Sequence, residues 1–205
     1  EQEIETSLLT PIRKAAELRA AGIKAQRGIL LHGPYGTGKS LVAYLAAQES
    51  LKNERTFVMC NMGMLGIAVH VSRFLQPSTL FIEDMDDFHS SYRGMSEIRN
   101  LLSGVENKVG FDTVTILTTN FLEKVIEADR SLMRPERIDA LIEIRAPSQG
   151  VVGKILQFAG NGWVKEGDDW DHIAQLMAES NTTPAIIIEI MNRAKIAAIN
   201  KEAGE

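Results

Sequence analysis

Two short stretches of the sequence combine residue types and spacings that suit phosphate chemistry. The first, GPYGTGKS at residues 33–40, matches G-x-x-x-x-G-K-[ST] and stands between an apolar stretch and a helix-like one. Glycines in such a loop let backbone N–H groups turn inward around phosphates, and the following helix terminus adds partial positive charge. The loop therefore predicts a nucleotide site formed by Gly33, Pro34, Tyr35, Gly36, Thr37, Gly38, Lys39, Ser40 and Leu41.

Within this loop, two side chains have distinct expected roles. Lys39 would reach the β- and γ-phosphates of ATP, and the Ser40 hydroxyl would bind Mg²⁺. A glycine-rich turn that matches the pattern by chance is the alternative, but the flanking strand and helix both favour the phosphate loop.

The second stretch, LFIEDMD at residues 80–86, brings two adjacent acids to the end of an apolar run. Mg²⁺ on a nucleotide needs a carboxylate at a neighbouring strand end, and hydrolysis needs one to orient or deprotonate water. Because adjacent strand residues point to opposite faces, we expect one of Glu83 and Asp84 to face the metal while the other, near the end of the strand, faces the γ-phosphate. Asp86 and Asp87 fit solvated acids that open a loop.

A polar tip also closes the apolar run TVTILTTN at residues 113–120. Asn120 would deliver an amide that holds the attacking water or touches the γ-phosphate. Asn is also a common turn residue at strand ends, so its position beside the other two motifs supports the functional interpretation.

The elements that must position these residues alternate along the chain. Continuously apolar strands separated by helices predict an α/β fold with a five-stranded parallel sheet covered on both faces. The expected strands are 28–33, 56–61, 79–84, 113–120 and 140–147, and the expected helices are 1–24, 39–50, 64–75 and 96–106.

The pattern changes after Pro147. Residues 149–205 contain no convincing strand and predict helices at 149–159, 169–179 and 184–200. We therefore divide the chain into an α/β nucleotide-binding domain, 1–147, and a small helical lid domain, 148–205.

Bulk composition excludes several classes of protein. An apolar fraction of 44% and a charged fraction of 24% are typical of soluble globular proteins. The net charge of −5 disfavours a general nucleic-acid or anionic-membrane binder, and no stretch approaches the ~20 apolar residues that span a bilayer. The single Cys60 cannot form an intrachain disulfide, which favours a reducing, cytoplasmic compartment. Because the chain begins with Glu, we expect a fragment of a longer protein.

Together, GILLHGPYGTGKS, TLFIEDMD, TILTTN and LMRPERID resemble the AAA family of ATPases, within the AAA+ superfamily of P-loop NTPases. The resemblance implies an αβα body with a helical lid, ring oligomers that are usually hexamers, and ATP hydrolysis at subunit interfaces. It also implies that 33–40 is Walker A, that Glu83 and Asp84 form Walker B, and that Asn120 is the sensor-1 residue.

The resemblance further implies that Arg134 and Arg137 reach into a neighbouring subunit's site. Pro135 would end the local helix and leave both guanidiniums at an exposed corner. A guanidinium supplied in trans to a γ-phosphate accelerates hydrolysis by ~10³–10⁵. The alternative is a pair of ordinary surface salt bridges, each worth at most ~1 kcal/mol.

Three features depart from the family pattern. The acids are ordered Glu-Asp, which is similar to the mitochondrial Rieske-protein translocase branch and to some phage-encoded AAA ATPases, and Asp84 is one methylene shorter than Glu. The segment 61–79 is short, with only NMGMLG where many unfoldases carry a pore loop. The stretch that helps hold adenine in relatives lies upstream of Glu1, which predicts reduced nucleotide affinity.

These observations predict an ATPase whose ring couples hydrolysis to remodelling or translocation of a protein substrate. Catalysis would use Glu83, Asp84, Asn120, Arg134 and Arg137, with Ser40 and Glu83 at the metal. One alternative is a nucleotide-gated assembly module with slow hydrolysis, which substrate-stimulated turnover would exclude. The other is a nucleic-acid motor or loader, which a failure to bind DNA would exclude.

Overall fold

The computed structural model describes residues 2–24, 26–85, 92–103, 112–135, 137–163 and 169–202. Asp86 and Asp87 lie outside the described residues. The described chain forms two compact units, one of residues 1–33 with 39–143 and the other of residues 34–38 with 144–205.

The first unit is built on a parallel sheet, as predicted. Its five strands stand in the order β2-β3-β4-β1-β5, and every neighbouring pair is parallel. The strands are β1 (Arg27–His32), β2 (Thr56–Asn61), β3 (Ser78–Glu83), β4 (Thr113–Thr119) and β5 (Ala140–Glu143). The α/β fold class is therefore confirmed.

Burial explains why these segments form the middle of the sheet. Every residue of β4 is buried, and β3 is buried up to its last residue, Glu83. Parallel strands that are buried along their length in this way are typical of sheets covered by helices on both faces. The register pairs Ile82 with Leu117 and Leu31 with Thr118, so β3, β4 and β1 end at one common edge.

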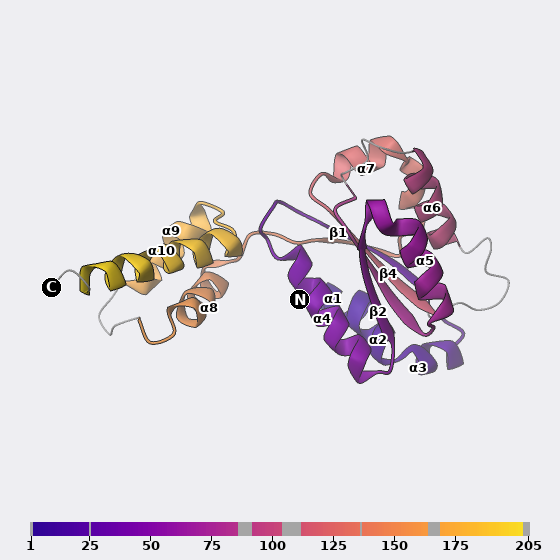
Figure 1. The fold of residues 1–205 in the computed structure, drawn as a ribbon, viewed down its shortest axis with the longest axis horizontal. Helices are drawn as coiled ribbons and strands as arrows, with labels where there is room; N and C mark the ends of the chain where they lie inside the picture. Colours follow the sequence, from indigo (N-terminus) through magenta and orange to yellow (C-terminus); the bar gives the residue numbers. More distant parts are fainter. Residues whose placement is uncertain are drawn as a thin grey trace. The chain divides into compact units, whose positions relative to one another are not determined.

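Helices cover the sheet on both sides. Figure 1 shows α4 with the amino-terminal helices on one side of the sheet, and α5 with α6 on the other. The helical segments of this unit are α1 (Gln2–Ile4), η1 (Glu5–Leu9), α2 (Thr10–Arg13), α3 (Ala15–Ala20), α4 (Lys39–Lys52), η2 (Met62–Met64), α5 (Leu65–Phe74), α6 (Tyr92–Ser103), α7 (Leu122–Ala128) and η4 (Arg130–Met133).

The predicted single helix over 1–24 is wrong in one respect, because it is broken. Residues 5–9 form a π-helical turn before Pro11, and Lys14 leaves the helical region with φ −120° and ψ 30°. Proline has no N–H for the helical ladder and its ring crowds the preceding turn, which accounts for the irregular turn at 5–9, whereas the α-helical segment α2 itself contains Pro11.

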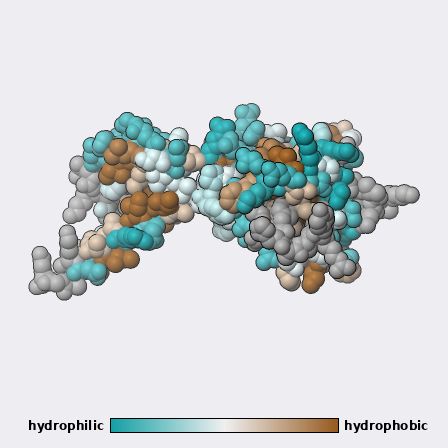
Figure 2. Space-filling view, turned by 90° about the horizontal axis from the view of Figure 1, so that it is seen from above, coloured by the Kyte–Doolittle hydropathy of each residue, from teal (hydrophilic) through white to brown (hydrophobic). Residues whose placement is uncertain are grey.

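The second unit contains a helical bundle, as predicted. Its helices are α8 (Gln149–Gly160), α9 (Trp170–Glu179) and α10 (Pro184–Glu202). They enclose a small core made of Val152, Leu156, Ala174, Ile187 and Met191. Figure 2 shows hydrophobic residues, in brown, on the surface of this bundle. The exposed large hydrophobic residues of α10 are Ile186, Ile188, Ile190, Ile196 and Ile199.

The described helices can be compared with what a membrane-spanning helix requires. Among them, none combines the length and the apolar character that a bilayer crossing requires.

Candidate functional site

The phosphate loop joins the end of β1 to the start of α4. His32 is the last residue of β1 and Lys39 the first of α4, which is the strand–loop–helix context that the sequence predicts. Gly36 and Gly38 have φ angles of 74° and 104°, a region that L side chains rarely adopt. The Thr37 hydroxyl donates a hydrogen bond of 2.9 Å to the Pro34 carbonyl oxygen. Glycines with positive φ are typical of turns that can direct backbone N–H groups toward an anion.

The lysine and serine that end the loop are held by different partners. Lys39 is only 7% exposed, and its Nζ donates a hydrogen bond of 2.7 Å to the Gly33 carbonyl oxygen. The Ser40 Oγ donates a hydrogen bond of 2.7 Å to Glu83 Oε1. The structure therefore brings together Ser40 and Glu83, the two residues predicted to hold the metal.

These two oxygen donors fit Mg²⁺. A hydroxyl and a carboxylate are the hard ligands that Mg²⁺ accepts when it binds with nucleotide phosphates, and the ion keeps waters for its other positions. Among the described residues no cluster of three His, Cys, Asp or Glu side chains is present. The described residues therefore do not form a metal site in which protein side chains supply every ligand.

Asp84 lies just beyond the end of β3, where the chain leaves the strand. Its φ angle is 47°, and its carboxylate Oδ1 accepts a hydrogen bond of 3.2 Å from Asn120 Nδ2. Glu83 and Asp84 therefore contact different partners, Ser40 for the first and Asn120 for the second. Both contacts lie at the edge of the sheet where β3 and β4 end.

Two of the predicted nucleotide contacts, Tyr35 within the loop and Leu41 just after it, lie at the surface. The side chains of Tyr35 and Leu41 are exposed, at 65% and 63%. Their exposure leaves them accessible to a ligand or to another chain.

The two arginines are placed differently from each other. Arg134 follows η4 and is exposed. Arg137 is half-buried, and its Nη1 donates hydrogen bonds to the Ser131 carbonyl oxygen at 2.8 Å and to the Ser131 Oγ. Arg137 Nε is buried and has no hydrogen-bond partner among the described atoms. Arg137 is thus fixed within its own segment.

A short polar cluster supports that segment. Asp129 caps η4 by accepting hydrogen bonds from the backbone N–H and the hydroxyl of Ser131. These bonds, with the nearby Arg99 and Arg137 charges, hold the pKa of Asp129 below its usual range. The carboxylate therefore stays charged and keeps the Arg130–Met133 turn in place.

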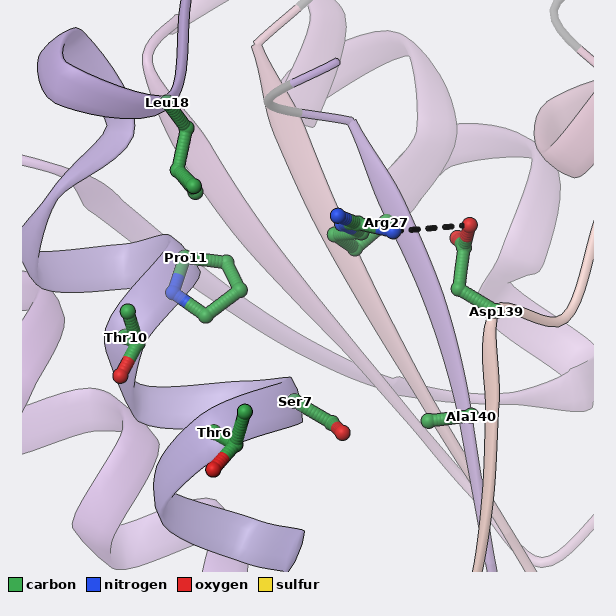
Figure 3. Close-up of a pocket in the computed structure, with 8 residues that line it drawn as sticks. All are labelled: Thr6, Ser7, Thr10, Pro11, Leu18, Arg27, Asp139 and Ala140. Carbon is green, nitrogen blue, oxygen red and sulfur yellow. Dashed lines mark hydrogen bonds and ion pairs between the residues drawn. The ribbon is translucent and has the colours of Figure 1, made fainter. Parts of the chain in front are cut away.

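A separate pocket of about 270 Å³ lies in the first unit. Figure 3 shows the hydroxyl side chains of Thr6, Ser7 and Thr10 on one side and the Arg27–Asp139 ion pair on the other. Arg27 is the first residue of β1, whereas the phosphate loop follows the last one. Six residues of strand span about 20 Å, so this pocket is distinct from the nucleotide site.

Comparison with known proteins gives a consistent result. Residues 29–146 match the family described as "ATPase family associated with various cellular activities (AAA)". The chain belongs to the AAA family. The matched range includes every residue that the sequence predicts for the site.

Several curated proteins are similar over much of the chain. The 26S proteasome regulatory subunit 6A of Saccharomyces cerevisiae is 25% identical over 99% of this chain and 48% of its own length. A proteasome-activating nucleotidase of Aeropyrum pernix is 31% identical over 72% of this chain and 40% of its own length. The protein named "Probable inactive ATP-dependent zinc metalloprotease FTSHI 4, chloroplastic", of Arabidopsis thaliana, is 28% identical over 93% of this chain and 25% of its own length. The chain spans less than half the length of each of these three relatives.

Two contributors to this AAA site were not foreseen from the sequence. Thr118 binds the backbone of Asp84 through its hydroxyl, and Ser131 binds Arg137. The TTN tip of β4 contained a signal for the first, because a buried threonine at a strand end must place its hydroxyl on a nearby partner. The second depends on a turn that brings residues 131 and 137 together.

Proposed function

We propose that this AAA chain binds and hydrolyses ATP as part of a homo-oligomeric ring, a hexamer, and uses the energy to remodel or translocate a protein. The observation that carries the proposal is the 2.7 Å hydrogen bond from Ser40 to Glu83. It joins the phosphate loop to the acid pair within hydrogen-bonding distance, as a site for a metal-bound nucleotide requires.

The phosphate loop would hold the substrate. Lys39 is almost completely buried, and its ammonium would exchange the Gly33 carbonyl for the β- and γ-phosphates of ATP. Backbone N–H groups of 34–38 would surround the phosphates. Mg²⁺, when bound with the nucleotide between Ser40 and Glu83, supplies charge neutralisation at the phosphate oxygens.

Asp84 and Asn120 would handle the attacking water. As the water oxygen forms its bond to the γ-phosphorus, the Asp84 carboxylate accepts its proton and the bond to the ADP oxygen breaks. Asn120, bonded to Asp84 at 3.2 Å, would orient the water through its amide. Asp84 is exposed, which gives water access to its carboxylate.

Arg134 would act on the site of a neighbouring subunit. Its exposed position suits a guanidinium that stabilises charge developing on the γ-phosphate in trans. Arg137 remains a weaker proposal for the same role, because its Nη1 is already bonded to Ser131.

The proposed substrate class is a protein. Proteins named as proteasome regulatory subunits and proteasome-activating nucleotidases are among the similar sequences, and a net charge of −5 disfavours a nucleic-acid track. We also propose the Glu-Asp branch of the family, shared with Rieske-protein translocase-like and phage-encoded members, and a reducing, cytoplasmic compartment.

A second candidate is a nucleotide-gated assembly module in which slow hydrolysis serves as a timer. The shorter carboxylate of Asp84 and the brief η2 segment in place of a long pore loop favour it. Turnover that does not respond to unfolded protein would support this candidate over a remodelling ATPase.

The test is the steady-state ATPase rate as a function of protein concentration. We expect specific activity to rise with concentration, to fall at least 100-fold in Arg134→Ala and in Asp84→Asn, and to return partly when the two variants are mixed. Mixing restores sites that take an intact Asp84 from one subunit and an intact Arg134 from its neighbour.

Lys154→Ala is a matched control, because it removes a cation at a distance in sequence from every site motif. Flat specific activity, or Arg134→Ala with normal turnover, would contradict a shared site. A nucleotide-binding chain in which neither wild type nor mixtures hydrolyse ATP would overturn the enzymatic proposal.

A further inference from the structure

Asp84 has a backbone conformation that needs support from elsewhere in the fold. Its φ of 47° lies in the left-handed region, which is sterically unfavourable for an L-residue, although Asp tolerates it better than most residues. We propose that Thr118, on β4, is a positioning residue that fixes this conformation and thereby aims the Asp84 carboxylate. The inference rests on the proposed role of Asp84 in hydrolysis.

The contacts of Thr118 are directed at the turn that ends β3. Its Oγ1 accepts a hydrogen bond of 3.0 Å from the Asp84 backbone N–H, and its carbonyl oxygen accepts one of 2.8 Å from the Met85 N–H. One residue therefore binds two successive N–H groups. Thr118 is 2% exposed and is paired in register with Leu31 on β1, so its own position is fixed by the sheet.

This arrangement matters because the Asp84 side chain is short. An Asp carboxylate has only two side-chain torsions, so the backbone orientation largely decides where its oxygens lie. A longer Glu could correct a small backbone displacement through its additional torsion, whereas Asp cannot. The left-handed turn and the Thr118 hydroxyl would therefore fix where the Asp84 carboxylate lies, because Asp lacks the additional methylene with which Glu could adjust it.

The end of β4 acts on the same carboxylate in two ways. Thr118 binds the backbone of Asp84, and Asn120, two residues later, binds its Oδ1. Thr119, between them, accepts a hydrogen bond of 3.3 Å from the Gly33 N–H at the start of the phosphate loop. The end of β4 thus links Asp84 to the phosphate loop. Within this strand end, Thr118 is the residue that fixes the backbone of Asp84.

The experiment compares Thr118→Val, Thr118→Ser and Thr115→Val in the whole chain. Valine keeps the shape of threonine but removes the hydroxyl, and serine keeps the hydroxyl. Thr115 is a matched control, because it is a buried threonine of the same strand, at 1% exposure, away from the acid pair. Each protein is measured for amide hydrogen exchange at Asp84, nucleotide affinity and kcat.

We expect Thr118→Val to speed exchange of the Asp84 amide at least tenfold in the nucleotide-free protein. We also expect kcat to fall about tenfold, as loss of one ordinary hydrogen bond predicts, with nucleotide affinity unchanged. Thr118→Ser should keep both values near wild type, and Thr115→Val should leave both unchanged. Unchanged exchange and kcat in Thr118→Val would overturn the inference, as would equal losses in Thr115→Val.

A double variant separates this inference from the proposed function. If Thr118 acts through the Asp84 carboxylate, Thr118→Val adds no further loss to Asp84→Asn, because Asn also tolerates the left-handed conformation. Additive losses would show that Thr118 acts elsewhere. If Asp84→Asn hydrolyses ATP normally, the proposed function fails, whereas Asp84→Asn inactive with Thr118→Val fully active refutes only the role of Thr118.

Discussion

The two ends of the same sheet carry polar clusters of opposite character. At the amino-terminal end, the Arg55 side chain is 2% exposed and donates hydrogen bonds to Asp112 Oδ1 at 2.8 Å and to the Ser78 carbonyl oxygen at 2.8 Å. Asp112 is also paired with Arg19. At the carboxyl-terminal end, Glu83, the last residue of β3, is partly exposed, and Asp84, which follows it, is exposed.

The difference reflects what each end must do. A charge removed from water is tolerated only when nearby groups replace its hydration, and the amino-terminal cluster supplies those groups. The exposed acids at the other end keep their hydration and can exchange a single hydrogen bond for a ligand. We infer that the amino-terminal cluster stabilises the fold, whereas the carboxyl-terminal cluster is available for chemistry.

The largest effect that would test this contrast is expected at Asp112. Asp112→Ala leaves Arg55 buried without its ionic partner, and breaking such a pair typically costs about 3–5 kcal/mol of unfolding free energy. Urea denaturation measures the loss. Asp84→Asn, at the other end, should change the unfolding free energy by less than about 0.5 kcal/mol while it abolishes turnover.

Comparable destabilisation by the two variants would break the contrast. A loss below about 1 kcal/mol for Asp112→Ala would show that Arg55 finds other partners or water. In that case the amino-terminal cluster would not be a major source of stability.

A smaller effect on the unfolding free energy is expected for the two arginines. Arg137 and Arg134 lie close in sequence, yet we expect the first to act on stability and the second on turnover. Arg137→Ala removes two hydrogen bonds from Ser131 and should cost about 1–3 kcal/mol of unfolding free energy. Arg134 is exposed, so Arg134→Ala should leave the unfolding free energy within about 0.5 kcal/mol and act on turnover alone. Thermal unfolding and ATPase assays on both variants separate the roles. Equal stability of the two variants would argue that Arg137 does not anchor the segment.

Much of the fold could be predicted because its signals are local or repetitive. The apolar residues in the middle of β3 and β4 indicate a buried sheet, and both strands are buried at almost every position, threonines included. The break at Lys14 was missed because the apolar spacing of 1–24 continues across it. The short helix α7 was also missed, since its seven residues, about two turns of mixed character, give little periodic signal.

The candidate site likewise contains features that local sequence predicts and features that depend on contacts between distant residues. The phosphate loop is recognisable because its glycines, lysine and serine are adjacent in the chain. The left-handed conformation of Asp84 is not, because it depends on Thr118 from another strand. The separate environments of Arg134 and Arg137 likewise arise from the turn that places Ser131 near residue 137. Roles set by contacts across the fold are the part that the sequence did not reveal.

The smallest predicted effect concerns a surface cluster between α2 and α4. Glu49 accepts hydrogen bonds from Arg13 at 2.5 Å and from Lys52 at 2.8 Å, which lower the pKa of its carboxyl to about 2. A folded pKa below the unfolded value of about 4.5 adds stability above pH 4.5, and this stability is lost as pH falls toward 2. Because Arg13 and Lys52 are exposed to solvent, we expect less than about 1 kcal/mol.

Urea denaturation at pH 7, 4.5 and 3 measures this contribution. The stability difference between wild type and Glu49→Gln should be largest at pH 7 and shrink as the pH falls. Glu17→Gln, in an exposed pair with Lys14 at 3.3 Å, is the matched control and should show a smaller difference at pH 7. A Glu49→Gln difference that stays constant from pH 7 to pH 3 would contradict the assigned pKa, because the carboxylate would then contribute through packing and not through its charge.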